Sequence, residues 1–188
     1  NMLTLPNILT LFRIAIVPLI IILFYVDTFW GYWVALGLFL CAAATDFFDG
    51  YYARSFDQVT ALGKFLDPIA DKILIGSILL MLTGFGHIYD VHIIPALLIF
   101  CRELVVSGLR ECLSHYRFDI PVSNLAKWKT VFQMLAVGFL LVGKYSYGPL
   151  CFGKIGIFFL WIGAIVTWIT GYHYLVKGLP VLWSQSKE

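Results

Sequence analysis

The sequence predicts an all-α integral membrane protein with six helices, and its composition and its apolar runs are the basis of this prediction. Of its 188 residues, 61% are hydrophobic and only 13% are charged, and the mean hydropathy is +0.89. Ordinary soluble domains are about half apolar and about a quarter charged. A soluble chain of this length could not bury so much apolar surface. At ~20 residues per span, the chain has room for about six spans and for no large soluble domain.

Six apolar stretches with short linkers are the candidate spans, and we expect helices because open sheet edges are excluded from lipid. The first contains Pro18 and the fourth Pro95, which are expected to kink or start their helices. We find no repeat of 20–50 residues, so the chain is expected to form a single domain over residues 1–188. Asn1, before Met2, is expected to be a remnant of cloning. The stretches cover residues 8–26, 32–53, 65–83, 92–112, 125–142 and 155–176.

Lys and Arg residues divide unequally between the two sides of the predicted bundle. If the N-terminus is cytoplasmic, only Lys144 and Lys154 lie on the outer side, and the other eleven of the 13 lie on the inner side. Cytoplasmic loops of membrane proteins carry an excess of Lys and Arg. Both termini are therefore predicted to be cytoplasmic.

Four aspartates lie within the apolar stretches, toward their cytoplasmic ends. Asp46 and Asp49 are three residues apart near the end of the second stretch, whereas Asp67 and Asp71 are four apart at the start of the third. Each pair shares one helix face, and intramembrane charges normally line a cavity. Four converging carboxylates would repel one another, and oxygen-rich sites bind Mg²⁺, Mn²⁺ or Ca²⁺ rather than zinc. The spacing therefore predicts a site for two divalent cations, which suits displacement at phosphorus.

Small residues accompany the aspartates. Gly50 lies on the helix face of Asp46, and Gly63 precedes Asp67 by one turn. Glycine allows close approach of a backbone or a ligand, and the guanidinium of Arg54 can bind phosphate in a bidentate manner. Small residues also serve helix packing in membranes, and single positions do not decide between the two interpretations.

Residues 46–71 resemble the signature of the CDP-alcohol phosphotransferase family, D-x2-D-G-x2-A-R-x8-G-x3-D-x3-D, and fill all eight fixed positions. Further segments are similar to a bacterial subgroup of that family, the phosphatidylglycerophosphate synthases. They include residues 6–13 and 65–72, residues 102–104 with 107–111, and residues 127–130 with 133–134.

The resemblance implies a fold, a reaction and a location. It implies six transmembrane helices, a homodimer, and Mg²⁺ or Mn²⁺ ions on Asp46, Asp49, Asp67 and Asp71. The implied reaction transfers the phosphatidyl group of CDP-diacylglycerol to sn-glycerol 3-phosphate, giving phosphatidylglycerophosphate and CMP. The implied location is the bacterial inner membrane, with the active site facing the cytoplasm. Asp71 is implied to be the general base as well as a metal ligand, although spacing alone does not select Asp71 over Asp67.

A donor site is implied near the aspartates. Asn7 and Thr10 lie at the cytoplasmic mouth of the first helix, but Asn7 could instead cap that helix after Pro6. The hydroxyl of Thr45 could equally bond to its own helix backbone. The expected CDP-diacylglycerol-binding residues are Asn7, Thr10, Thr45, Asp49, Gly50, Arg54 and Gly63.

A second basic group predicts a site for a phosphorylated acceptor. Arg102 and Arg110 are eight residues apart, or about two turns on one face of the fourth helix. A phosphate needs cations and donors away from the metals, whereas a neutral alcohol does not. Alternatively, Arg102 pairs with Glu103, and the lysines contact anionic head groups. The expected acceptor-binding residues are Arg102, Arg110, Lys127, Lys129 and Thr130.

Other functions are less consistent with these patterns. The same chemistry could serve another acceptor, such as inositol phosphate, serine or phosphatidylglycerol. A divalent-cation transporter would need acidic residues across the bundle, and the aspartates cluster at one end. The net charge of +2 gives no drive toward nucleic acid.

Overall fold

The computed structural model describes residues 5–56, 61–115, 124–146 and 151–185. The side chains at 5–6, 46–56, 61–65, 67, 115, 124–127 and 185 lie outside this description. The described residues form six α-helices and one short 3-10 turn, Asp90–His92. The helices are α1 (Leu5–Val26), α2 (Phe29–Phe56), α3 (Ala61–Gly84), α4 (Ile93–His115), α5 (Asn124–Gly143) and α6 (Phe152–Gln185).

The all-helical prediction is confirmed, because each apolar stretch corresponds to one helix. Three segments are long and apolar enough to cross a membrane, Asn7–Val26, Asp90–Ser114 and Phe152–Ser184, and two shorter apolar segments are Phe29–Thr45 and Trp128–Gly143. Charged residues interrupt the apolar sequence of α3 and of the second half of α2. Large apolar side chains cover much of the outer surface, as expected for a chain in contact with lipid.

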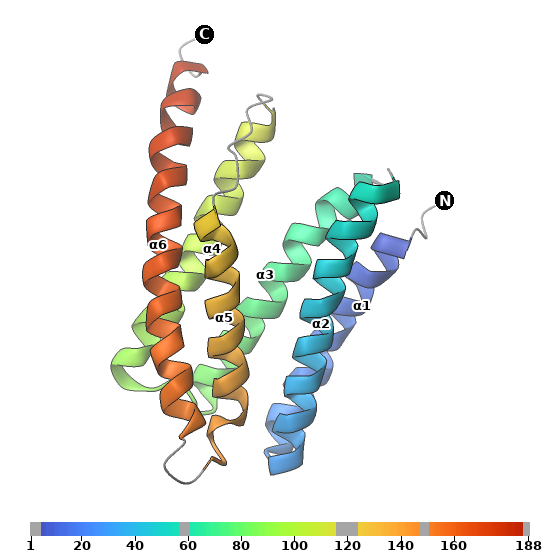
Figure 1. The fold of residues 1–188 in the computed structure, drawn as a ribbon, viewed down its shortest axis with the longest axis vertical. Helices are drawn as coiled ribbons and strands as arrows, with labels where there is room; N and C mark the ends of the chain where they lie inside the picture. The colour runs from blue at the N-terminus through green and yellow to red at the C-terminus, as the bar shows by residue number, and fades with distance from the viewer. Residues whose placement is uncertain (1–4, 57–60, 116–123, 147–150, 186–188) are drawn as a thin grey trace.

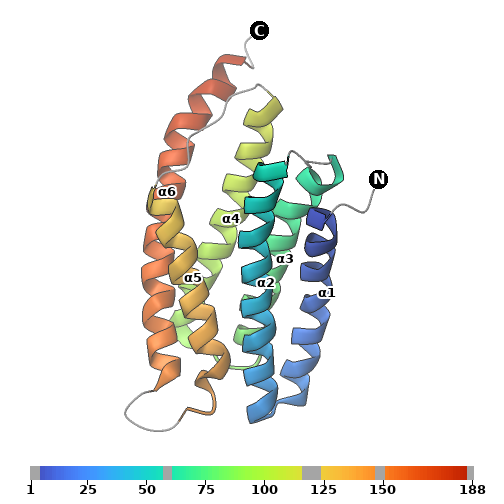
Figure 2. The same cartoon turned by 45° about the vertical axis from the view of Figure 1, so that its right-hand side comes forward.

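The helices form two groups that meet in the lower half of Figure 1. In one group α1 packs against α2 and α3, and in the other α6 packs against α4 and α5. Buried residues such as Ile20, Phe24, Ile78 and Leu140 form a core between the groups. The groups lie apart toward the end that holds the start of α1 and the end of α6 (Figures 1 and 2). The two groups are thus in contact at one end of the molecule and separate toward the other.

The last helix is longer than the sequence analysis predicted. It continues through Pro180 to Gln185, although the apolar stretch was expected to end at residue 176. Val181 and Leu182 pack against buried residues of α4, including Leu109 and Leu113. This apolar packing extends the helix past a residue that normally interrupts one.

Glycines bring α5 and α6 into close contact. A β-carbon at Gly143 would lie 2.6 Å from the Cα of Gly153, and one at Gly156 would lie 2.9 Å from the backbone nitrogen of Leu140. Small residues commonly allow such close packing between helices in membranes.

We expect Gly156→Ala to destabilise the protein, because the new methyl group would collide with the backbone of α5. Overpacking of this kind costs about 1–3 kcal/mol, so the thermal midpoint of the detergent-solubilised protein should fall. Gly37→Ala is the matched control, since a β-carbon at Gly37 meets no atom within 4 Å of the described structure. Equal midpoints for the two variants would show that this contact is not tight.

A polar cluster joins the two helix groups at the end of the molecule where they are in contact. Lys144 donates to both carboxylate oxygens of Asp27, at 2.6 and 2.8 Å, and the hydroxyl of Tyr32 donates to Asp27 Oδ1 at 2.8 Å. The hydroxyl of Tyr145 donates to the Asp27 carbonyl at 2.7 Å. The Lys144 ammonium and the Tyr32 hydroxyl hold the pKa of Asp27 below its usual value. These bonds join the turn between α1 and α2 to the end of α5.

Candidate active site

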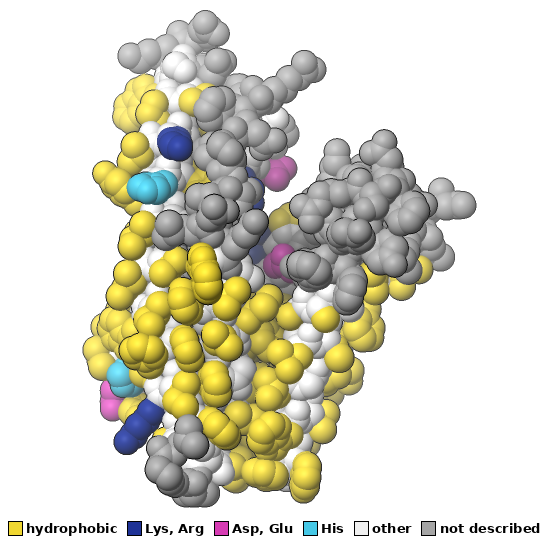
Figure 3. All heavy atoms as spheres, viewed as in Figure 1, with side chains coloured by type: hydrophobic (Ala, Val, Ile, Leu, Met, Phe, Trp, Pro, Cys, Tyr) yellow, Lys and Arg dark blue, Asp and Glu magenta, His cyan; other side chains and the backbone are white. Residues whose placement is uncertain are grey.

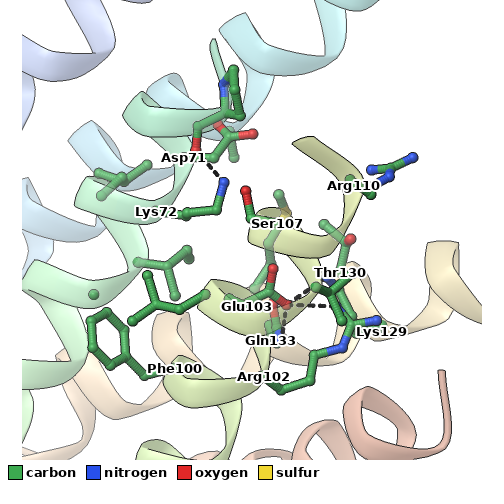
Figure 4. A pocket seen from close by; sticks show the side chains of 18 of the residues that line it. Asp71, Lys72, Phe100, Arg102, Glu103, Ser107, Arg110, Lys129, Thr130 and Gln133 are labelled. Atoms are coloured by element: carbon green, nitrogen blue, oxygen red, sulfur yellow. Dashed lines mark hydrogen bonds and ion pairs between the residues drawn. The ribbon is translucent and has the colours of Figure 1, made fainter. Parts of the chain in front are cut away.

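A cavity of about 520 Å³ lies between the two helix groups, and all six helices contribute to its lining. Figure 3 shows the molecule hollowed at this place, with acidic and basic side chains inside the hollow. Asp71 of α3 lies on one wall, and Arg102, Glu103 and Arg110 of α4 with Lys129 of α5 lie on the other (Figure 4). The cavity therefore places an acidic group opposite a basic cluster.

Asp71 is held by a buried arginine. Nη1 of Arg13, on α1, donates to Oδ1 of Asp71 at 2.6 Å. The side chain of Arg13 is 1% exposed, whereas that of Asp71 is 50% exposed and lines the cavity. The ion pair fixes the carboxylate between α1 and α3 while leaving it accessible. An accessible carboxylate suits both a hard divalent cation and proton transfer.

The other three metal-site aspartates lie outside the described side chains, although their positions in the helices are known. Asp46 and Asp49 are in the last part of α2, and Asp67 is in the first part of α3. These two helix ends lie side by side in Figures 1 and 2. Within the described side chains, no three His, Cys, Asp or Glu residues converge. The carboxylate chemistry of Asp71 fits Mg²⁺ or Mn²⁺, and the helix positions fit a shared site.

The expected donor-site residues are divided between the described and the undescribed parts of the chain. Asn7 and Thr10 are buried in α1, Asn7 with 1% exposure. Asn7 is the third residue of α1, so the alternative that it precedes and caps this helix is wrong. The hydroxyl of Thr45 donates to the Ala42 carbonyl at 2.8 Å, which is the helix-bonded alternative. Gly50 and Arg54 in α2 and Gly63 in α3 lie outside the described side chains.

Arg102, Arg110 and Lys129 lie on one side of the cavity, which we call the basic wall. Glu103 lies among them and accepts hydrogen bonds from two of them. Lys129 Nζ donates to Glu103 Oε1 at 2.6 Å, and Arg102 Nη1 donates to the same oxygen at 3.2 Å. Gln133 Nε2 contacts this oxygen at 3.4 Å and donates to Thr167 Oγ1 at 3.0 Å. The alternative pairing of Arg102 with Glu103 is thus present in the structure. The network joins α4, α5 and α6 behind the cavity.

Arg102 is fixed in place by α6. Its Nη2 donates to Thr170 Oγ1 at 2.8 Å. A β-carbon at Gly171 would lie 2.9 Å from Arg102 Cγ and 3.0 Å from its Nε. Glycine at 171 therefore makes room for the side chain of Arg102. Because Arg102 is buried and held from two sides, it is positioned rigidly at the back of the basic wall.

Arg110 is the more accessible arginine of the basic wall. Its guanidinium carbon lies 5.6 Å from the ring centre of Tyr174, a cation–π distance. Arg110 and Thr130 are exposed and line the cavity. Within the described residues Arg110 makes no ion pair. Lys127 lies outside the described side chains.

Sequence reasoning did not assign a role to several residues that shape this site. Arg13 was noticeable as a charge inside the first apolar stretch, and its partner Asp71 is 58 residues away. Glu103 was considered only as a partner of Arg102, and its contact with Lys129 was not predicted. Gln133 falls in a segment of family resemblance, without any feature of its own that indicated a contact. Nothing in the sequence indicated that Thr170 contacts the site, because a threonine in an apolar helix is common.

An apolar groove of about 490 Å³ adjoins the cavity between α3 and α4. Lys72, Gly76, Phe100 and Leu104 line both spaces, and the groove continues along α3 to Thr83. Over this length the helix rises roughly 16 Å. One bilayer leaflet has a hydrocarbon depth of about 15 Å, so the groove is as long as a leaflet is deep.

Comparisons with known proteins show which family the chain is similar to. Residues 3–169 match the profile of the CDP-alcohol phosphatidyltransferase family. A protein of Rickettsia bellii is 47% identical over 170 residues, which cover 90% of this chain and 92% of the relative. Relatives from Haemophilus influenzae (37% identical; 90% of each chain) and Cereibacter sphaeroides (36% identical; 95% and 97%) are also similar. All three relatives are named CDP-diacylglycerol–glycerol-3-phosphate 3-phosphatidyltransferase.

Proposed function

The chain belongs to the CDP-alcohol phosphatidyltransferase family, and we propose that it transfers the phosphatidyl group of CDP-diacylglycerol to glycerol 3-phosphate. The products are phosphatidylglycerophosphate and CMP. The relatives that bear this name match the chain over nine-tenths or more of its length. The observation that carries the proposal is the cavity, in which the carboxylate of Asp71 faces a cluster of cations that suits a phosphorylated acceptor.

We propose that residues 1–188 form one transmembrane domain with six spans and with both termini in the cytoplasm of a bacterial cell. The start of α1 and the end of α6 lie at the same end of the molecule, toward which the two helix groups separate (Figure 1). Eleven of the 13 Lys and Arg residues fall on that side under this topology, in agreement with the positive-inside rule. The cavity then draws its water-soluble acceptor from the cytoplasm.

On the donor side, Asp46, Asp49, Asp67 and Asp71 would hold two divalent cations, Mg²⁺ or Mn²⁺. Such ions, when bound, neutralise phosphate charge and make the acceptor hydroxyl more acidic. Asn7, Thr10, Thr45, Gly50, Arg54 and Gly63 are proposed to surround the cytidine and its phosphates. Asn7 and Thr10 support this role by being polar and buried near the start of α1.

In the proposed reaction, Asp71 takes the proton of the attacking hydroxyl. The hydroxyl oxygen forms a bond to the phosphorus that bears diacylglycerol, and the anhydride bond to CMP breaks, so CMP leaves with the bonding electrons. Arg13 orients the Asp71 carboxylate through its 2.6 Å contact. A carboxylate beside an arginine is a weak base, so it needs an acidified hydroxyl to be effective.

On the acceptor side, Arg110, Lys129 and Thr130 are proposed to bind the phosphate of glycerol 3-phosphate. Arg110 is accessible, and Lys129 has donors besides the one that contacts Glu103. Arg102 is bound to Glu103 and Thr170. We propose that it contributes positive charge to the phosphate site without contacting the phosphate. Lys127 is assigned to the same site from its position two residues before Lys129.

The apolar groove between α3 and α4 is proposed to hold one acyl chain of the donor. It is continuous with the cavity at Lys72 and Phe100, and its length matches one leaflet. The homodimer implied by the family resemblance stays a prediction.

The proposed function predicts metal-dependent release of CMP from CDP-diacylglycerol by the purified protein with one acceptor of a panel. The panel contains glycerol 3-phosphate, inositol 1-phosphate, inositol, serine and phosphatidylglycerol, each with Mg²⁺, Mn²⁺ or excess chelator. We expect release with glycerol 3-phosphate and a loss of release with chelator.

Two outcomes would contradict the proposal in different ways. Release with another acceptor alone would keep the donor and overturn the acceptor assignment. Absence of metal-dependent release with every acceptor would overturn the donor assignment as well.

A further inference from the structure

The two carboxylate oxygens of Glu103 have different surroundings. Oε1 receives the hydrogen bonds that described residues donate to this carboxylate, from Lys129, Arg102 and Gln133. Within the described residues, Oε2 has no hydrogen-bond partner. The side chain is 23% exposed and lines the cavity, and Figure 4 shows one of its oxygens directed away from the dashed bonds. Glu103 therefore presents to the cavity a carboxylate oxygen that no described residue contacts.

A negative charge at this place opposes the binding of a phosphate. Lys129, one of the proposed phosphate-binding residues, is 2.6 Å from the carboxylate, so Glu103 lowers the net positive charge of the basic wall. A neutral residue could fill the same volume without this electrostatic cost. An ionised carboxylate is however the strongest acceptor for a hydroxyl group, because charge-assisted hydrogen bonds are about twice as strong as neutral ones.

The order of groups along the cavity matches the order of groups in glycerol 3-phosphate. In the view of Figure 4, Glu103 lies between Asp71 with Lys72 on one side and Lys129 with Thr130 on the other. The acceptor carries a reacting hydroxyl at one end, a phosphate at the other, and a second hydroxyl on the carbon between them.

We propose that Oε2 of Glu103 accepts a hydrogen bond from the hydroxyl on the middle carbon of the acceptor, and that Glu103 thereby selects a glycerol phosphate. The inference rests on the proposed function. Arg102, Lys129 and Gln133 hold Oε1 and so fix the direction of Oε2. A site with a fixed polar partner discriminates strongly against an analogue that lacks the matching hydroxyl, because the partner is then left unpaired.

The test compares glycerol 3-phosphate with 3-hydroxypropyl phosphate, which lacks only the middle hydroxyl. The ratio of kcat/KM for the two acceptors is measured in the wild type and in Glu103→Gln. We expect the wild type to prefer glycerol 3-phosphate by about 10- to 100-fold, as expected for a hydrogen bond to a charged group. In Glu103→Gln the ratio should fall at least several-fold, through slower reaction of glycerol 3-phosphate.

Gln133→Met is the matched control, because it removes a donor to Oε1 and leaves Oε2 in place. Its overall rate can fall, but its acceptor ratio should stay near that of the wild type. Glu103→Asp keeps the charge but moves the carboxylate away from the acceptor, because the side chain is one methylene shorter, so the acceptor ratio should also fall. The Asp variant serves as the test if Glu103→Gln does not fold.

The outcomes separate this inference from the proposed function. A wild-type ratio near one, or an unchanged ratio in the Glu103 variant, would overturn the role of Glu103 while the protein still used glycerol 3-phosphate. An equal fall in the ratio for Gln133→Met would also overturn it, since the effect would then be structural. No reaction with glycerol 3-phosphate in the wild type would overturn the proposed function itself.

Discussion

Asp71→Asn is expected to lower the rate of CMP release by about 10²- to 10⁴-fold, the usual contribution of a positioned general base. The amide cannot take the proton of the acceptor hydroxyl, and it is a poorer ligand for a hard divalent cation than a carboxylate. The measurement is the initial rate with saturating CDP-diacylglycerol and glycerol 3-phosphate. Because Arg13 loses its ionic partner in this variant, the thermal midpoint has to be recorded beside the rate.

Asp90→Asn is the matched control for this variant. Asp90 is exposed in the short turn before α4, at the opposite end of the molecule from the cavity, so the same chemical change should leave the rate near that of the wild type. A folded Asp71→Asn variant that keeps more than a tenth of the wild-type rate would contradict the assignment of Asp71 as the base.

Arg110→Gln is expected to raise KM for glycerol 3-phosphate by about 10- to 100-fold, because the phosphate loses a charge-assisted hydrogen bond. KM for CDP-diacylglycerol should change little, since Arg110 lies on the wall opposite Asp71. Initial rates over a range of each substrate separate the two constants. Arg110 is itself exposed, so loss of its contact with the buried ring of Tyr174 should affect the fold only slightly.

Lys177→Gln provides the comparison for Arg110→Gln, because Lys177 is an exposed cation of α6 that does not line the cavity. It should leave both KM values near the wild-type values. A similar rise in KM from both variants would indicate a general electrostatic effect on anion binding. In that case Arg110 would have no direct contact with the acceptor phosphate.

The helices were predictable because a membrane helix is indicated by a local pattern, a continuous run of apolar residues. Each apolar stretch indicated one helix, and most helix ends lie within a few residues of the predicted ends. The exception is the end of α6, which was expected at residue 176 and lies at Gln185. The stabilising contacts of Val181 and Leu182 are with α4, and such tertiary contacts are not visible in a local pattern.

The candidate site was only partly predictable for the same reason. The spacing of Asp67 and Asp71 is local, and it is enough to indicate a shared helix face. In contrast, Arg13 is 58 residues from its partner Asp71, and Thr170 is 68 residues from its partner Arg102. The two oxygens of the Glu103 carboxylate differ in their surroundings partly because Lys129 of α5 contacts only Oε1. This contact forms because the fold brings α4 and α5 together, and no local sequence pattern indicates it.

The central claim is that the acceptor phosphate binds on the basic wall, across the cavity from Asp71. The most direct measurement is an experimental structure of the Asp71→Asn variant with CDP-diacylglycerol, Mn²⁺ and glycerol 3-phosphate. We predict that the acceptor phosphate lies within hydrogen-bonding distance of Arg110 and Lys129, with its reacting hydroxyl directed toward position 71. A glycerol 3-phosphate bound elsewhere, with the basic wall in contact with the cytidine phosphates instead, would contradict this account.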